Sequence, residues 1–158
     1  MFSFSRLSTK DIFVDINESD FKSIVFHLLR NSRFSRKKEA FKKILERENL
    51  GTTALGNNVA IPHCRLNNFQ GFYLKFALFK EKLGYVAENK DEVRFMFLVV
   101  GSQNKPGYYL RALSHIVQVV KKPIVRDNLL RTKTKGQIRD MLCSYESELF
   151  EQKVCRWK

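Results

Sequence analysis

The stretch that decides the fold is Gly51-Thr-Thr-Ala-Leu-Gly-Asn-Asn-Val-Ala-Ile-Pro-His-Cys-Arg65, a polar loop that leads through an extended segment to a histidine. Gly56, Asn57 and Asn58 are residue types that adopt left-handed and tight-turn dihedrals at low cost. Successive backbone N–H groups in such a loop can converge on an anion. We therefore expect residues 56–58 to form a phosphate-binding loop.

The segment after this loop is expected to hold one histidine in a defined position. Pro62 fixes its own φ and favours extended geometry at the residue before it, so residues 59–61 are predicted to form a short strand. His63 follows directly. A histidine that accepts a phosphoryl group needs one unprotonated ring nitrogen, with the other tied to a carbonyl or carboxylate. His63 is the candidate for this role; a histidine that only hydrogen-bonds a loop is the alternative.

These residues resemble the EIIA domains of the bacterial sugar phosphotransferase system, in the fructose/mannitol class and its nitrogen-regulatory branch. The match consists of Glu46-Arg47-Glu48 followed by residues 51–63, where the family pattern is close to E-R-E-x-x-G-S-T-G-I-G-N-G-V-A-I-P-H. Weaker similarity extends from Leu7 to the segment 110–120. The resemblance implies a single α/β domain, with a mixed central sheet flanked by helices.

The resemblance also implies a function. His63 would accept a phosphoryl group from an HPr-like protein and pass it to a IIB domain or signal to a regulatory target. Arg47 occupies the position of the family's arginine, and a guanidinium there can clamp the phosphate with two hydrogen bonds. No cofactor or metal is implied. Standing alone, the chain is expected to belong to the nitrogen-regulatory branch; a fructose/mannitol-type sugar carrier is the alternative.

The sequence departs from the family pattern at several positions. Many members have a second histidine near the start of the helix after the last long strand, and Tyr109 stands there in this chain. His115 cannot replace it, because six residues at 100° each place it about 120° around the helix. Asn58 replaces the usual glycine and Cys64 the usual small residue. A tyrosine hydroxyl can donate a hydrogen bond to phosphate but carries no positive charge.

Length and composition predict one globular domain. The chain has 158 residues, 44% of them hydrophobic, with 14 Phe to build a core. No apolar run reaches the roughly 18–20 residues that a membrane span needs, and no secretory signal is indicated. We expect a cytoplasmic protein without membrane insertion, with residues 1–150 as the domain and residues 151–158 as a C-terminal tail.

The net charge of +13 raises the question of an anionic partner. Two clusters carry much of it: Arg30, Arg33, Arg36, Lys37, Lys38, Lys42 and Lys43 in the first, and Lys121, Lys122, Arg126, Arg131, Lys133, Lys135 and Arg139 in the second. Solvated helix faces have the same composition. A different class of function therefore stays open, a non-enzymatic module that uses its basic surface on nucleic acid or an acidic protein.

The three cysteines, Cys64, Cys143 and Cys155, match neither a zinc pattern nor a disulfide framework. Cys64 adjoins His63, which raises the alternative of a nucleophile and its base. Neighbours on an extended segment point to opposite faces, however, so this pairing is disfavoured. His27 and His115 lie within expected helices and are interpreted as structural.

Periodicity predicts the remaining elements. Apolar residues recur at helical spacing in residues 20–31, from Ser35 to near Gly51, in residues 109–120 and in residues 134–150, with short turns at 124–130. Ser19, Ser35 and Thr134 are the expected N-caps. Residues 72–79 and 93–100 are expected to be interior strands, with a short strand at 84–86. Interleaved helices and strands favour a central sheet covered by helices.

Overall fold

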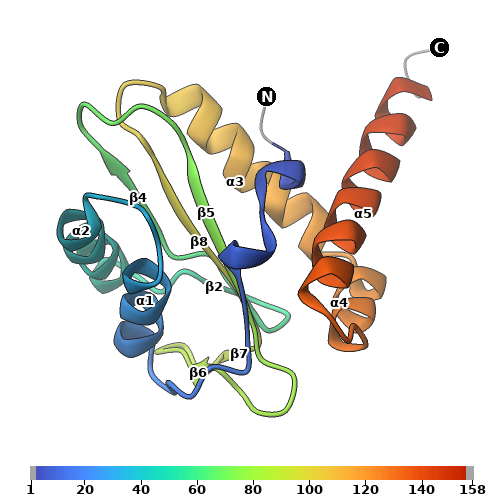
Figure 1. Ribbon diagram of the computed structural model, residues 1–158, viewed down its shortest axis with the longest axis horizontal. Helices are drawn as coiled ribbons and strands as arrows, with labels where there is room; N and C mark the ends of the chain where they lie inside the picture. The colour runs from blue at the N-terminus through green and yellow to red at the C-terminus, as the bar shows by residue number, and fades with distance from the viewer. Residues whose placement is uncertain (1–2, 156–158) are drawn as a thin grey trace.

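The computed structural model describes residues 3–155 and shows a mixed β-sheet with helices on both faces (Figure 1). The predicted α/β class is therefore confirmed. In chain order the elements are the 3-10 helices η1 (Phe4–Arg6) and η2 (Thr9–Asp11), then β1 (Ile12–Val14), α1 (Phe21–Arg30), α2 (Lys37–Asn49), β2 (Ala54–Gly56), β3 (Val59–Ala60), β4 (His63–Leu66), β5 (Tyr73–Leu78), β6 (Tyr85–Val86), β7 (Glu92–Val93), β8 (Phe95–Ser102), α3 (Pro106–Val120), α4 (Pro123–Leu130) and α5 (Lys135–Cys155).

Strand β8 is the centre of the sheet. Its path is β1-β5-β8-β3-β2, and β4 also pairs with β8. β5 runs antiparallel to β8 along one side, whereas β3 and β4 run parallel to it along the other. β6 and β7 form a separate two-stranded sheet.

Both faces of β8 are buried, which explains why its sequence is a nearly continuous apolar run. Phe95, Phe97 and Val99 face one core, which α3, α4 and α5 cover. Met96 and Leu98 face the other core, which α1 and α2 cover. The helices thus divide between the two faces as Figure 1 shows, with α1 and α2 opposite α3, α4 and α5.

The interruption between β3 and β4 positions His63. Ala60 pairs with Met96, the strand then breaks at Ile61 and Pro62, and pairing with β8 resumes where His63 lies opposite Val99. Pro62 has no N–H to donate, but its carbonyl accepts a bond from the Val99 amide at 2.9 Å. The strand predicted at residues 59–61 is confirmed for Val59–Ala60, which form β3; Ile61 lies in the break, and His63 begins the next strand.

Two of the expected helix caps are wrong. Helix α1 is capped by Asp20, whose carboxylate accepts from the Ser23 amide at 2.9 Å, instead of by Ser19. Helix α2 starts after Arg36 without a side-chain cap, so Ser35 does not serve there. A carboxylate that accepts from an amide at a helix N-terminus gains from the helix dipole as well as from the hydrogen bond, which favours Asp20 over its serine neighbour.

The last helix begins as expected but ends later. Thr134 Oγ1 accepts from the Gln137 amide at 3.1 Å, as a cap should. Helix α5 then continues to Cys155, into the segment 151–158 for which the sequence indicated no element. The rest of that segment lies outside the described residues. None of the helices within residues 3–155 combines the length and apolarity needed to cross a membrane.

The other two histidines have structural positions, as predicted. His27 lies 2.7 Å from Glu18, and its neighbour Phe26 is exposed. His115 is buried on α3, 2.8 Å from the Glu146 carboxylate of α5. Glu146 also accepts from the Phe4 amide, so this cluster joins the N-terminal segment to two helices.

Candidate functional site

The imidazole of His63 is held by the backbone just before it. Nδ1 lies 2.7 Å from the Ile61 carbonyl oxygen. A carbonyl only accepts, so this contact assigns the proton of the neutral ring to Nδ1 and leaves Nε2 with its lone pair. The arrangement is the one that a nucleophilic histidine needs.

Burial lowers the pKa of His63 below its ordinary value of 6.5. The hydrogen bond to Ile61 and the charge of Glu48 oppose this change, whereas the positive charges of Arg47 and Arg65 add to it. The net lowering keeps the ring neutral over more of the physiological pH range. A neutral ring is the form in which Nε2 can attack phosphorus.

His63 opens into a cavity of about 510 Å³ that also contains Arg47 and Tyr109. Its lining residues come from α2 and the residue after it, from β4, from the residue after β8 and from the first half of α3: Lys43, Glu46, Arg47, Leu50, His63, Cys64, Arg65, Gln103, Tyr109, Leu110 and Leu113. Arg47, in the last turn of α2, also donates from Nη1 to the Gly51 carbonyl at 3.0 Å. The structure thus brings together three of the predicted site residues.

Tyr109 occupies the cavity beside the histidine. Its ring centroid lies 6.0 Å from that of His63, and the Arg65 guanidinium lies 5.6 Å from the Tyr109 ring centroid. The ring packs on Gly101 of β8, where an added Cβ would lie only 2.3 Å from it. Burial raises the pKa of Tyr109, so the phenol stays neutral and can donate a hydrogen bond.

The structure does not bring residues 56–58 to His63. They form the turn of the β2–β3 hairpin: Gly56 has φ 80°, Asn57 54° and Asn58 65°. Two consecutive positive φ values are what a tight hairpin turn requires. The Asn58 carbonyl accepts from the Phe95 amide at 2.9 Å, which places the turn at the start of β8, whereas His63 lies opposite Val99.

The turn residues are therefore absent from the described lining of the His63 cavity. The left-handed dihedral angles expected for a phosphate-binding loop are present, but they form the turn of the hairpin. A local pattern predicts the turn, but only the register of β3 on β8 shows where it lies.

Cys64 is buried in the opposite core, as the alternation along a strand predicted. Burial raises the pKa of its thiol to about 12. A thiol with such a pKa is protonated at physiological pH and is a poor nucleophile. The alternative pairing of Cys64 with His63 as nucleophile and base is therefore not supported.

Glu48 is a supporting residue whose role the sequence analysis did not identify. Its carboxylate accepts from the Thr53 amide at 3.0 Å and the Thr53 hydroxyl at 2.5 Å, and from the Thr52 hydroxyl at 2.9 Å. The bonds join the end of α2 to the segment that enters β2. The signal was present in the acidic residue that follows Arg47 and precedes two threonines.

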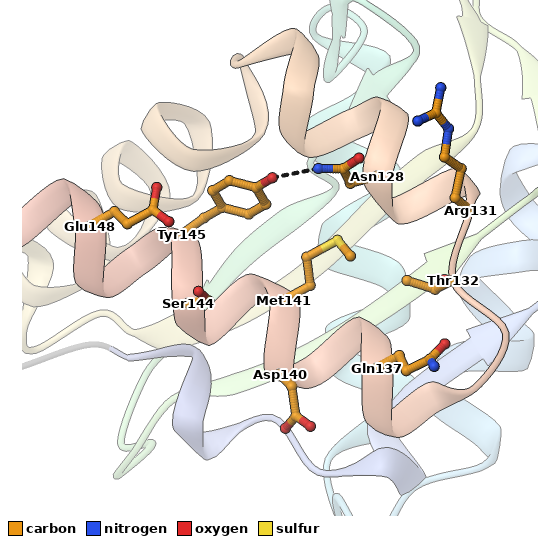
Figure 2. Close-up of a pocket in the computed structure, with 9 residues that line it drawn as sticks. All are labelled: Asn128, Arg131, Thr132, Gln137, Asp140, Met141, Ser144, Tyr145 and Glu148. Atoms are coloured by element: carbon orange, nitrogen blue, oxygen red, sulfur yellow. Dashed lines mark hydrogen bonds between the residues drawn. The ribbon is translucent and has the colours of Figure 1, made fainter.

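Another cavity, of about 590 Å³, lies between α4 and α5 (Figure 2). Asn128 and Tyr145 point toward each other across it and are joined by a hydrogen bond of 2.6 Å. It contains none of the predicted site residues. Among residues 3–150, whose side chains the structure describes, no group of three or more His, Cys, Asp or Glu side chains is placed to hold a metal ion.

The chain is similar to known proteins over most of its length. Residues 7–145 match the family described as phosphoenolpyruvate-dependent sugar phosphotransferase system, EIIA 2. Among solved structures, the chain is similar to the nitrogen regulatory protein IIA-Ntr from Neisseria meningitidis, with 25% identity and a TM-score of 0.77. The match covers 88% of this chain and 97% of that one.

Curated relatives fall into two groups. A nitrogen regulatory protein from Bradyrhizobium diazoefficiens is 28% identical over 102 residues, which are 65% of this chain and 67% of the relative. A fructose-specific EIIABC component from Bacillus subtilis is 23% identical over 110 residues, 69% of this chain. The matched part spans only 17% of that longer protein.

Proposed function

The chain belongs to the EIIA type 2 family of the phosphoenolpyruvate-dependent sugar phosphotransferase system, and from that premise we propose that it carries a phosphoryl group on Nε2 of His63. It is a phosphocarrier or regulatory component of this system. The observation that carries the assignment to His63 is its bond to the Ile61 carbonyl, which leaves Nε2 unprotonated. No other described histidine shares a cavity with Arg47 and Tyr109.

The proposed reaction exchanges one phosphorus–nitrogen bond for another. The Nε2 lone pair of His63 attacks the phosphorus of a phosphohistidine on an HPr-like donor. The donor's phosphorus–nitrogen bond breaks, and its electron pair returns to the donor imidazole. The proton of His63 stays on Nδ1 throughout, where it is donated to the Ile61 carbonyl oxygen. In onward transfer a nucleophile of the acceptor attacks the phosphorus, and the electron pair of the breaking phosphorus–nitrogen bond returns to Nε2 of His63.

Arg47 and Tyr109 stabilise the group during transfer. Phosphoryl transfer passes through a loose transition state with charge on the equatorial oxygens, so positioned donors supply most of the catalysis. The Arg47 guanidinium offers charged donors and the Tyr109 phenol a neutral one. Both residues line the cavity that contains His63.

The rim of the cavity suits contact with another protein. Leu50 and Leu110 line it and are 87% and 58% exposed. Large apolar side chains exposed around a polar centre are characteristic of protein contact sites. The proposed partners are an HPr-like donor and, as acceptor, either a IIB domain or a regulatory target. The reaction is proposed to occur in the cytoplasm, where phosphoenolpyruvate is formed.

The test is phosphorylation of the purified chain by phosphoenolpyruvate, enzyme I and an HPr-like protein from the same organism, with intact-mass measurement. One added phosphoryl group is the expected result. Omitting the HPr-like protein is the control, since enzyme I alone should not label the chain. An unchanged mass with every component active contradicts the proposal. If the chain then also bound nucleic acid in a salt-sensitive way, the basic binding module would replace it.

A sugar-carrier role is the second candidate, because the fructose-specific relative from Bacillus subtilis matches 69% of the chain. Its name joins A, B and C components, so a IIB domain is the corresponding acceptor. Transfer from the labelled chain to a fructose-type IIB domain distinguishes the roles. Rapid loss of label to IIB favours the sugar carrier, and a stable label favours the regulatory role.

A further inference from the structure

A third cavity, of about 880 Å³, lies where η2, the end of α1 and strand β5 meet. It shares no lining residue with the His63 cavity. Four cations and one carboxylate line it, together with hydroxyl and amide groups and two aromatic rings: Ser8, Thr9, Lys10, Asp11, Arg30, Asn31, Ser32, Arg33, Phe34, Tyr73 and Lys75. The lining is therefore strongly basic.

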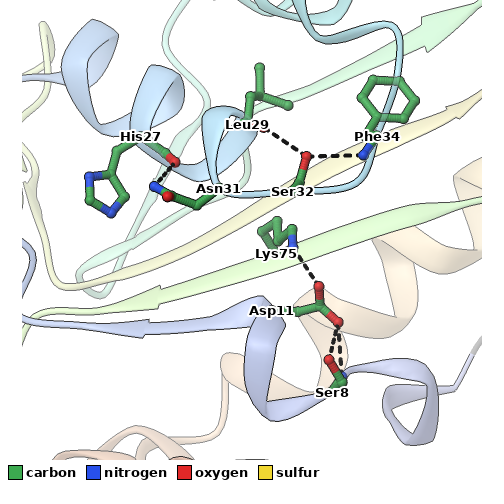
Figure 3. A network of polar contacts seen from close by, with 8 residues as sticks. All are labelled: Ser8, Asp11, His27, Leu29, Asn31, Ser32, Phe34 and Lys75. Atoms are coloured by element: carbon green, nitrogen blue, oxygen red, sulfur yellow. Dashed lines mark hydrogen bonds and ion pairs between the residues drawn. The ribbon is translucent and has the colours of Figure 1, made fainter.

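Lys75 is a buried lysine in the wall of this cavity. It lies in β5, a strand with sheet partners on both sides, and is only 3% exposed. Figure 3 shows its side chain directed at Asp11, whose Oδ1 lies 2.5 Å from Nζ. The ammonium also lies 5.0 Å from the Tyr73 ring and 5.8 Å from that of Phe13. A cation rarely occupies such a position unless it is paired.

Both carboxylate oxygens of Asp11 already accept hydrogen bonds from neighbouring groups. Besides Lys75, the amide and hydroxyl of Ser8 donate to its Oδ2 at 3.0 and 2.8 Å. Although burial opposes the change, these bonds lower the pKa of Asp11, so it stays ionised and balances Lys75. Lys10, Arg30 and Arg33 then remain, and none of them has an ion pair with any described residue. The Arg30 guanidinium lies 5.7 Å from the Phe26 ring centroid, so Lys10 and Arg33 are the two cations without a described charge or ring partner.

Tyr73 adds an independent observation. Its hydroxyl oxygen is buried, and within residues 3–155 it has no hydrogen-bond partner. An unmatched buried hydroxyl costs free energy, and a ligand oxygen would recover it once the Tyr73 ring turned its hydroxyl into the cavity that it lines. The Tyr73 ring stacks on Phe34 with centroids 5.1 Å apart, so the two rings also give the cavity an apolar wall.

We propose that this cavity binds a phosphorylated small molecule of nucleotide size through its phosphate groups. Guanidinium and ammonium groups pair with several phosphate oxygens at once, and three cations that lack an ion pair among the described residues favour a ligand with more than one negative charge. The volume is in the range of ligand sites and far exceeds one orthophosphate ion. A concave site with an aromatic wall fits a nucleotide better than an extended nucleic acid.

Titration calorimetry with ATP, tripolyphosphate, adenosine and citrate, without metal ions and at low salt, tests the proposal. ATP and tripolyphosphate should bind, adenosine should not, and citrate should bind at least about tenfold more weakly. Equal affinity for citrate, or no binding of ATP, overturns the proposal. The His63→Ala variant should bind ATP like the parent chain, so failure of the phosphocarrier role and failure of this site are distinguishable.

Variants locate the binding. The double variant Lys10→Ala/Arg33→Ala should weaken ATP binding about tenfold or more. The matched control is Lys121→Ala/Lys133→Ala, which removes the same charge from the second basic cluster. An equal loss of ATP affinity in both double variants would mean diffuse attraction to a basic surface and would overturn the proposal. Competition of an oligonucleotide with ATP that is equally strong in both double variants would overturn it too.

Tyr73→Phe is the sharpest single change, because it removes only the unmatched hydroxyl. The melting temperature should stay the same or rise, while ATP affinity falls about threefold to tenfold. Unchanged affinity removes Tyr73 from the site. Lys75→Met tests the buried cation, and its binding is read only after circular dichroism shows a native fold; full affinity in a folded Lys75→Met chain also contradicts the proposal.

Discussion

The rings of His63 and Tyr109 lie 6.0 Å apart between centroids, at an interplanar angle of 57°. A neutral phenol thus stands beside the proposed phosphoryl acceptor, in the place where the family resemblance indicated a second histidine. Tyr109 can reach this place because β8 has glycine at position 101. Phosphate on His63 would meet a hydrogen-bond donor there, with positive charge supplied by arginines instead.

His63→Ala should abolish phosphorylation by the donor system. In the parent chain the label should be labile in acid and stable in base, as expected for a phosphoramidate. Cys64→Ala is the matched control at the next position, and it should keep the label because burial raises the pKa of the Cys64 thiol to about 12, so the thiol is not the acceptor. Labelling of His63→Ala at the parent level would show that the site assignment is wrong.

Arg47→Ala should slow phosphorylation far more than it destabilises the fold. Loss of one donor to transition-state charge typically raises a barrier by about 2–4 kcal/mol. Its hydrogen bond to the Gly51 carbonyl is solvent-exposed, so we expect a loss of about 1 kcal/mol or less in the free energy of unfolding. Rapid-quench rates and melting temperatures measure both effects, with the exposed Arg139→Ala as control. An unchanged rate would remove Arg47 from the site.

Tyr109 variants test the neutral donor. Tyr109→Phe should slow transfer only modestly, because one hydrogen bond to a charged oxygen contributes about 1.5–3 kcal/mol at most. Tyr109→His introduces a group that becomes cationic below about pH 6.5, so its transfer rate should vary with pH in that range. If both variants match the parent rate between about pH 5.5 and 8, Tyr109 has no part in transfer.

The pH dependence of the parent chain should follow His63. Its lowered pKa predicts a rate that stays constant from neutral pH to below the ordinary histidine value of 6.5, then falls as the ring is protonated. The unfolded chain, with the higher pKa, binds the proton first. The free energy of unfolding should therefore decrease as pH falls through about 6.5. Denaturation of the parent and His63→Gln from about pH 7.5 to 5 checks this, since the variant lacks this contribution.

Glu48→Gln should destabilise the chain by about 1–3 kcal/mol, because the carboxylate accepts from both Thr52 and Thr53. Glu46→Gln is the control from the same helix turn. Its one ion pair among the described residues, with Lys42 at 3.9 Å, is exposed, so the substitution should cost less than about 0.5 kcal/mol. Urea denaturation compares the two. Equal midpoints would show that the Glu48 contacts contribute nothing to stability.

Local patterns predicted much of this protein. The dihedral restriction that Pro62 imposes on itself and on the residue before it indicated an extended segment before His63. The apolar periodicity of residues 20–31 and 109–120 indicated helices that the structure contains. These signals work because dihedral preferences and amphipathic faces act over a few residues. The Glu46-Arg47-Glu48 and 51–63 motifs also led to the family. Positive φ values at Asn57 and Asn58 were likewise anticipated from residue type.

Only the tertiary structure decided which of these residues meet. The turn at Asn57 and Asn58 and the ring of His63 are close in sequence but lie at different points along β8, since strand register is a contact between distant segments. Tyr109 reaches His63 because Gly101 leaves room for its ring. In the sequence, Lys75 is a single charged residue within an apolar strand. It lines a cavity only because η2 and α1 end beside β5. Such placements depend on packing between elements, which no local preference encodes.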